Sequence, residues 1–248
     1  MKTFVTTLIF ATITITGITN RLTAQTQDST KEKAKQAPAE DFRDDWADLR
    51  HYEAENKTLP SPAKNEKRVV FLGSSIFENW KSLVPSYWEN KAYVNRGISG
   101  QISPQLLLRF RQDVINLKPA AVIILAGSND ISGTTGHVTN ERILENIRSM
   151  TELAQLHKIK VILCAYLPIN EYPWRKGFEP AEKIISLNNA IIDYARAKKL
   201  TVLDYYTPLV DDRKGQKPEL SLDGVHPNAA GYAIMARVTD ELINKVIR

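Results

Sequence analysis

The sequence predicts an α/β fold with a five-stranded parallel sheet covered by helices on both faces. Short apolar runs rich in β-branched and aromatic residues recur at 69–72, 92–95, 121–126, 160–166 and 201–206. Segments in which apolar residues have helical spacing separate these runs. The runs are apolar along their whole length, which is typical of strands buried on both faces of a parallel sheet.

The first segment of the chain, 1–24, predicts a secretory signal peptide. Lys2 precedes an uncharged stretch rich in Thr and Ile, and Ala24 offers a cleavage site. A retained transmembrane helix is the alternative, but the many threonines and the Asn20-Arg21 pair disfavour it. No cysteine directly follows the apolar stretch to carry a lipid. We therefore expect an exported protein, periplasmic or extracellular, without a stable membrane anchor.

A linker and an N-terminal arm are expected next. Residues 25–39 include no aromatic or branched apolar residue, which predicts a disordered linker. Apolar residues at three- and four-residue steps over 40–57 predict an amphipathic helix, within an arm (40–65) that packs on the domain. Its apolar positions are Phe42, Trp46, Leu49 and Tyr52. The domain itself is expected to span 66–248.

Helices are expected between the strands, near 103–117, 139–157 and 180–199, and after the last strand, near 227–247. Three of them begin at a residue followed by proline, which is favoured at the first helical position. These pairs are Ser103-Pro104, Glu179-Pro180 and His226-Pro227, and Ser103 is expected to cap its helix.

Charge and cysteine content exclude some classes of function. The whole chain has a formal net charge of +5, with 33 basic and 28 acidic residues. Removal of the signal takes Lys2 and Arg21 and leaves a balance too even to indicate a nucleic-acid partner. Cys164, the one cysteine, lies inside an apolar run and is expected to be a buried structural thiol.

Polar residues follow four of the five predicted strands. In open parallel sheets, ligands bind beyond the carboxyl ends of the strands, so these loops are expected at one edge. They are Gly73-Ser74-Ser75, Asn95 to Gly100, Gly127 to Asp130, and Asp223 to Pro227. Together they offer hydroxyls, backbone N–H groups, a carboxamide, a carboxylate and an imidazole, which is the set of groups that acyl transfer needs.

His226 and Asp223 have the spacing of a base and the group that orients it. Because Pro227 disfavours helical backbone before it, His226 is expected to be extended just outside the last helix. Asp223, three residues earlier in a turn with glycine, can accept a hydrogen bond from the imidazole. Singly, each of the four loops is more simply explained as a turn or a helix cap, but together they predict a catalytic site.

The remaining roles are those of the nucleophile and the oxyanion donors. A serine between a strand and a helix keeps its backbone N–H free, because the first helical N–H groups lack intrahelical partners. The local sequence leaves open whether Ser74 or Ser75 is the nucleophile. Gly97 allows a substrate oxygen to approach the main chain, and Asn129 presents an NH₂ group.

Four short blocks, in order, resemble the SGNH hydrolases, also called the GDSL esterase family. They are FLGSS, NRGISG, LAGSND and DGVHPN, and the resemblance covers about residues 66–247. It implies a flavodoxin-like three-layer α/β/α sandwich that hydrolyses esters without a metal or organic cofactor. The overall pattern is similar to the exported branch near the platelet-activating-factor acetylhydrolase-like and carbohydrate acetylesterase groups.

The resemblance also implies a role for each matching residue. It assigns the nucleophile to Ser75, the base and its orienting group to His226 and Asp223, and the oxyanion donors to Ser75 N–H, Gly97 N–H and the Asn129 side chain. One residue departs from the pattern, since the aspartate usual before the nucleophile is Ser74 here. We expect activity to survive, because that position has none of the catalytic roles.

The substrate is expected to be a small-molecule or carbohydrate ester. The long segment 167–182 follows a strand at the catalytic edge, and such loops are often functional. Ser74, Tyr172, Trp174 and Arg175 are candidate substrate-lining residues, although Trp174 is at least as well explained as an anchor of its loop. A short acyl ester, such as acetyl on a glycan, is the first expectation. A lysophospholipid-type ester and a catalytically inactive glycan-binding module are the alternatives.

Overall fold

The structure is a computed structural model that describes residues 45–134, 136 and 138–247. The predicted signal peptide, the predicted linker and the first residues of the arm lie outside this range. Among the described helices, none is long and apolar enough to cross a membrane.

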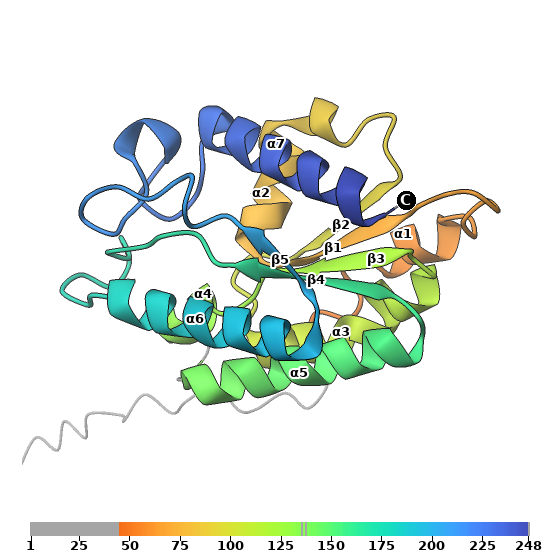
Figure 1. Cartoon of the computed structure of the whole chain (residues 1–248), viewed down its shortest axis with the longest axis horizontal. Helices are drawn as coiled ribbons and strands as arrows, with labels where there is room; N and C mark the ends of the chain where they lie inside the picture. Colours follow the sequence, from red (N-terminus) through yellow and green to blue (C-terminus); the bar gives the residue numbers. More distant parts are fainter. Residues whose placement is uncertain (1–44, 135, 137, 248) are drawn as a thin grey trace, which may run out of the picture. The chain divides into compact units, whose positions relative to one another are not determined.

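Five parallel strands form one sheet, which confirms the predicted fold class. They are β1 (Val69–Gly73), β2 (Tyr93–Gly97), β3 (Ala121–Ile124), β4 (Lys160–Ala165) and β5 (Thr201–Asp204). Their order is β2-β1-β3-β4-β5, with β3 at the centre and β1 beside it (Figure 1). β1 and β2 end level with each other, because Gly73 pairs with Gly97 in the ladder. The segments that follow these two strands therefore emerge side by side.

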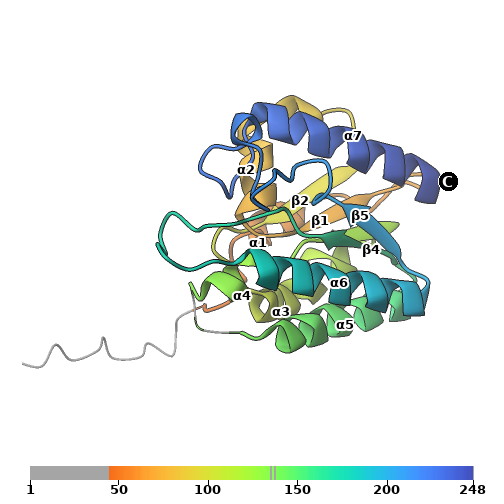
Figure 2. The same ribbon diagram turned by 60° about the vertical axis from the view of Figure 1, so that its left-hand side comes forward.

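Helices cover both faces of the sheet and give the three layers (Figures 1 and 2). On one face lie α2 (Ser75–Leu83) and α7 (Ala229–Val246). On the other lie α3 (Ser103–Asp113), α5 (Asn140–Leu156) and α6 (Ala181–Lys198). The shorter helices are α1 (Glu53–Thr58), α4 (Ser128–Ser132) and the 3₁₀ turns Pro85–Tyr87, Ile115–Leu117 and Pro218–Leu220.

The described part of the N-terminal arm, 45–65, is less helical than predicted, since α1 is its only helix and residues 45–52 form turns. Backbone carbonyls of the arm, which would accept hydrogen bonds within a helix, instead accept them from glutamine side chains of α3 and of the loop before it. Gln101 donates to Ala47 O at 2.7 Å, and Gln105 to Trp46 O at 2.5 Å. The Trp46 side chain is 51% exposed, so the predicted apolar stripe is not buried as one face.

The predicted cap of α3 is also wrong. Ile102 occupies the N-cap position, and Ser103 is the first helical residue. The Ser103 backbone N–H and hydroxyl instead donate to Asp130 Oδ1, at 2.9 and 2.5 Å. At the last helix, the Asn228 side chain caps α7, so the helix begins two residues later than predicted.

Cys164 is buried in the core as predicted, at 2% exposure. Burial raises the pKa of its thiol well above the ordinary value. A thiol that stays protonated in an apolar core is a structural residue.

Candidate active site

Side chains of Ser75, His226 and Asp223 form one hydrogen-bonded chain. Ser75 is the first residue of α2, two positions after the end of β1. Its Oγ lies 3.0 Å from His226 Nε2, and His226 Nδ1 lies 2.8 Å from Asp223 Oδ2. The fold thus brings together the hydroxyl, imidazole and carboxylate that the sequence places on separate loops.

The loop before α7 holds the imidazole in place. Asp223 Oδ1 accepts the backbone N–H groups of Val225 at 2.9 Å and of His226 at 2.8 Å. The His226 carbonyl in turn accepts hydrogen bonds from Ser221 Oγ at 3.0 Å and from Leu222 N–H. Both the backbone and the ring of His226 are therefore fixed relative to Asp223.

The charge of Asp223 determines which nitrogen of His226 faces Ser75. Burial acts to raise the pKa of Asp223, but hydrogen bonds from His226 and Val225 outweigh it and hold the pKa below the ordinary 3.8. An ionised carboxylate can only accept a hydrogen bond, so His226 Nδ1 carries the proton. The lone pair of Nε2 then points at the Ser75 hydroxyl.

Two of the predicted oxyanion donors are free in the described part of the chain. The Ser75 N–H is at the first position of α2, where no intrahelical acceptor exists. Asn129, 8% exposed in α4, uses one carboxamide hydrogen to bind Gln101 O at 2.9 Å. Its second carboxamide hydrogen has no acceptor among the described residues.

The third predicted donor, Gly97, requires a correction. Its N–H donates to Asn95 Oδ1 at 2.8 Å and so is already used within β2. A Cβ at position 97 would lie 2.4 Å from Glu78 N and 2.8 Å from Ser74 O. Gly97 is therefore a glycine because α2 packs closely against the end of β2.

Gly100, the last residue of the same block, was not predicted and has the features of a donor. Its φ is +77°, and a Cβ there would meet no atom within 4 Å. Its N–H has no acceptor within the part of the chain that the structure describes. Gln101, its neighbour, is held by Asn129, so the two donors lie close together. Both glycines of NRGISG were visible in the sequence, but only the backbone distinguishes them.

Ser74, a candidate substrate-lining residue, is buried at 5% exposure and does not face the site openly. It occupies the N-cap position of α2, where its carbonyl accepts the N–H groups of Phe77 and Glu78. Its side chain lies beside the Tyr166 hydroxyl. Burial raises the pKa of Tyr166 to about 12, and hydrogen bonds from Ser128 and Ser74 oppose that rise. Ser74 thus belongs to a buried hydroxyl cluster behind the nucleophile.

Of the three residues predicted in the long loop, Tyr172 is buried, which corrects its predicted role. Its hydroxyl donates to Ser128 O at 2.9 Å. Trp174 is 49% exposed, and its ring centroid lies 6.2 Å from that of His226. Arg175 Nη1 donates to Ser132 O at 2.6 Å, and its guanidinium stacks on Phe178. Arg175 therefore ties the loop to the end of α4.

A hollow of about 460 Å³ lies beside these groups, lined by Ser132, Gly133, Thr134, Trp174 and Arg175. It adjoins Asn129, because the Ser132 hydroxyl and the Gly133 N–H both donate to Asn129 O, at 2.9 and 3.1 Å. Trp174 connects it to His226. Within the described residues, no group of three or more His, Cys, Asp or Glu side chains is arranged to hold a metal ion.

The comparison with protein families identifies the chain. The model of the GDSL-like Lipase/Acylhydrolase family matches residues 71–234, a range that includes the Ser75–His226–Asp223 chain. The chain belongs to this family. It is therefore an acylhydrolase, and the predicted resemblance is confirmed at the level of the family.

Solved structures similar to this acylhydrolase share its fold over most of the chain. A candidate acylhydrolase from Bacteroides fragilis NCTC 9343 is 45% identical, with a TM-score of 0.81 over 83% of this chain and 100% of that one. A GDSL-like lipase from Bacteroides thetaiotaomicron VPI-5482 is 47% identical, with a TM-score of 0.78 over 80% and 98%. An acetylxylan esterase from Geobacillus stearothermophilus, 20% identical with a TM-score of 0.57 over 75% and 96%, shares the fold.

A curated relative is the uncharacterized lipoprotein YqeF of Bacillus subtilis (strain 168). It is 32% identical in an alignment of 141 residues that covers 50% of this chain. The chain spans 56% of the length of that relative.

Proposed function

We propose that this acylhydrolase is an exported serine esterase that removes short acyl groups, acetyl above all, from carbohydrate esters. The observation that carries the proposal is the hydrogen-bonded chain from Ser75 Oγ through the His226 ring to Asp223. A nucleophile, a base and an orienting carboxylate in hydrogen-bond contact are what acyl transfer through a covalent intermediate requires.

The reaction follows from the direction of these hydrogen bonds. Ser75 Oγ attacks the ester carbonyl while His226 Nε2 takes its proton, and Asp223 stabilises the imidazolium that forms. His226 then protonates the leaving alcohol as the acyl–oxygen bond breaks. Water, deprotonated by His226, attacks the acyl-enzyme and releases the carboxylic acid and the Ser75 hydroxyl.

Three donors serve the oxyanion in this proposal. They are the Ser75 N–H, the Gly100 N–H in place of the predicted Gly97, and the second carboxamide hydrogen of Asn129. All three are buried or half-buried, so they need little reorganisation when charge develops on the carbonyl oxygen.

The carbohydrate preference is supported by the lining of the hollow beside the site. Two hydroxyls, a guanidinium and a half-exposed indole line it, and an indole face with polar neighbours suits a sugar ring. Its volume, about 460 Å³, is in the usual range of ligand pockets. A lysophospholipid would need an apolar groove for its acyl chain, whereas the residues that line this hollow include no aliphatic side chain.

Export is supported by the signal-type sequence at 1–24 and by the similarity to a protein named a lipoprotein. The alternative of an inactive glycan-binding module has less support, because a binding site does not require the 3.0 Å contact between Ser75 and His226. Fractionation of the cells that produce the protein would test its location.

The test of the function is hydrolysis of nitrophenyl esters of increasing chain length, alongside acetylated xylan. We expect the highest kcat/KM for acetyl and release of acetate from the polysaccharide. A preference for long chains would point to the lipid alternative. A fluorophosphonate should label the wild type and Ser74→Ala but not Ser75→Ala, and a folded wild type that takes no label would support the binding module.

A further inference from the structure

We propose that Arg109 is a positioning residue that holds the oxyanion donors in register. The proposal rests on the esterase function proposed above. Arg109 lies in α3, is fully buried, and has no contact with the space where the substrate would bind. It acts through the backbone segments that carry the donors.

Four hydrogen bonds involve all three nitrogens of the guanidinium. Nη2 donates to Gly73 O at 2.9 Å and to Arg96 O at 2.8 Å. Nε donates to Gln101 Oε1 at 2.6 Å, and Nη1 to Asp113 Oδ2 at 3.0 Å. The planar fork of an arginine fits such a set, whereas a lysine ammonium has neither the reach nor the geometry.

Three of these four acceptors belong to residues that lie close in the chain to Ser75 or Gly100, which carry proposed oxyanion donors. They are Gly73, Arg96 and Gln101. Gly73 lies two residues before Ser75, at the end of β1. Arg96 and Gln101 lie on either side of residues 97–100, so Arg109 binds that loop before and after it. Gln101 O also accepts from Asn129 Nδ2, at 2.9 Å. One buried side chain thus connects the segments that carry all three proposed donors.

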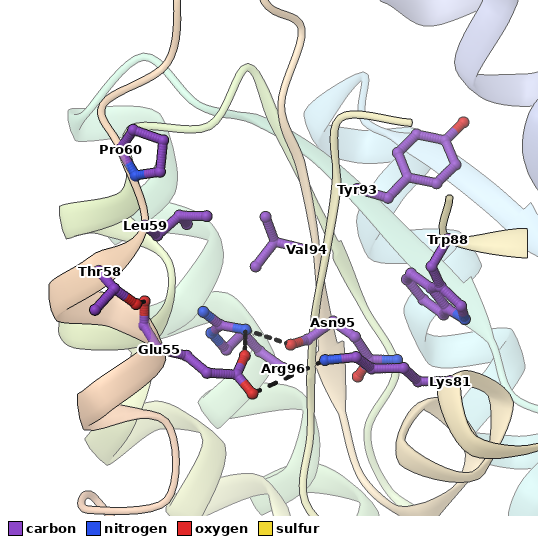
Figure 3. A pocket seen from close by; sticks show the side chains of 10 residues that line it. All are labelled: Glu55, Thr58, Leu59, Pro60, Lys81, Trp88, Tyr93, Val94, Asn95 and Arg96. Carbon is purple, nitrogen blue, oxygen red and sulfur yellow. Dashed lines mark hydrogen bonds and ion pairs between the residues drawn. The ribbon is translucent and has the colours of Figure 1, made fainter. Parts of the chain in front are cut away.

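Neighbouring contacts keep the same loop and Arg96 fixed. The Tyr52 hydroxyl, from the arm, donates to Gly97 O. The Arg96 guanidinium lies over the Tyr52 ring. It also donates to a carboxylate oxygen of Glu55 and to the Asn95 carbonyl, as Figure 3 shows. These contacts support the loop from the arm side, whereas the Arg109 side chain bonds Gly73 O, at the end of the strand that leads to the nucleophile.

A second buried arginine provides a matched control. Arg68 is 3% exposed, pairs with Glu66, and donates to Leu117 O at 3.1 Å and Pro60 O at 2.9 Å. It precedes β1, so it lies at the opposite end of the strand from Ser75. Replacement of either arginine by lysine keeps the charge and removes the fork, but only Arg109→Lys disturbs the donors.

The test measures kcat and KM for nitrophenyl acetate in the wild type, Arg109→Lys and Arg68→Lys, at a temperature where circular dichroism shows all three folded. We expect kcat of Arg109→Lys to fall about 10- to 100-fold with KM within about twofold, because misplaced donors weaken transition-state binding. Arg68→Lys should lose thermal stability and keep kcat. A kcat for Arg109→Lys within threefold of the wild type, or an equal loss in Arg68→Lys, would overturn the proposal.

A second pair of variants tests the positioning role of Arg109 if Arg109→Lys does not fold. Gln101→Met removes the acceptor of Arg109 Nε and a bond to the arm. Gln105→Met removes the equivalent arm bond, to Trp46 O, and the acceptor of the Ile102 N–H, but no bond of Arg109. We expect a lower kcat for Gln101→Met alone, and equal values would overturn the proposal. If the wild type itself neither hydrolyses esters nor takes a fluorophosphonate on Ser75, the proposed function fails, and the role of Arg109 fails with it.

Discussion

Ser75 Oγ and His226 Nε2 lie 3.0 Å apart although 151 positions separate the two residues. Helix α2 begins at Ser75, helix α7 begins at Ala229 just after His226, and the two helices contact each other. The Tyr232 hydroxyl of α7 donates to Ile76 O of α2 at 2.8 Å, and the Tyr232 ring stacks on Trp80 with centroids 5.3 Å apart. Because these contacts are buried, the base and the nucleophile are brought together by the packing of α2 against α7 before any substrate binds.

Replacement of Asn129 tests the oxyanion site directly. Loss of one oxyanion donor typically lowers turnover by about 10²–10³-fold, so we expect Asn129→Ala to show a fall in kcat of that size. Its side chain makes one other hydrogen bond, to Gln101 O, so the variant should remain folded. Steady-state kinetics with nitrophenyl acetate and a thermal melt check both points. Turnover near that of the wild type would remove Asn129 from the site.

The two glycines of the NRGISG block should respond differently to alanine. At Gly97 a new Cβ would lie 2.4 Å from a backbone nitrogen, and overpacking of this kind costs about 1–3 kcal/mol or more. At Gly100 the space is open, and only the positive φ opposes the change, at about 1–2 kcal/mol. Denaturant unfolding should therefore show the larger loss of stability in Gly97→Ala. The reverse order would contradict the packing role of Gly97.

The sequence predicts the strands of this protein better than its arm, its oxyanion donors or the residue that positions them. Continuous apolar runs predicted all five strands, because burial on both faces leaves a strong pattern. The arm was mispredicted, since its carbonyls bond to glutamines of the α3 region rather than within a helix. Gly97 and Gly100 could not be told apart, because the choice depends on an N–H direction and on φ. No sequence pattern pointed to Arg109, because only the fold brings its four hydrogen-bond acceptors together.

Trp174 should matter for carbohydrate substrates and not for small esters. Stacked aromatic pairs are worth about 0.5–1.5 kcal/mol, and we expect a similar value for a sugar ring on the indole. Trp174→Ala should therefore raise KM for acetylated xylooligosaccharides roughly 2- to 10-fold. The kcat for nitrophenyl acetate should stay within about threefold. Trp46→Ala is the matched control, because its indole is equally exposed, at 51%, but lies on the arm. An equal effect of the two substitutions would exclude Trp174 from the substrate site.

Asp223 should affect both activity and the pH dependence of stability. In Asp223→Asn the carboxamide can donate to His226 Nδ1 and favour the wrong tautomer, so we expect kcat to fall about 10²–10⁴-fold at neutral pH. The pKa of Asp223 in the folded protein is lowered below 3.8, so the folded state favours its ionised form. Its contribution to stability is therefore present above about pH 4 and is lost as the pH falls through the lowered pKa.

The stability part of this prediction is checked by urea unfolding of the wild type and Asp223→Asn at about pH 7 and about pH 3. The wild type should be the more stable at the higher pH, because its carboxylate accepts hydrogen bonds from Val225 and His226. The difference in the free energy of unfolding should shrink at the lower pH, where the carboxylate becomes protonated. A difference that stays constant or grows on acidification would show that the carboxylate is not stabilised in its ionised form. His226 Nδ1 would then lack a fixed carboxylate acceptor, and the Nε2 lone pair would not be held toward the Ser75 hydroxyl.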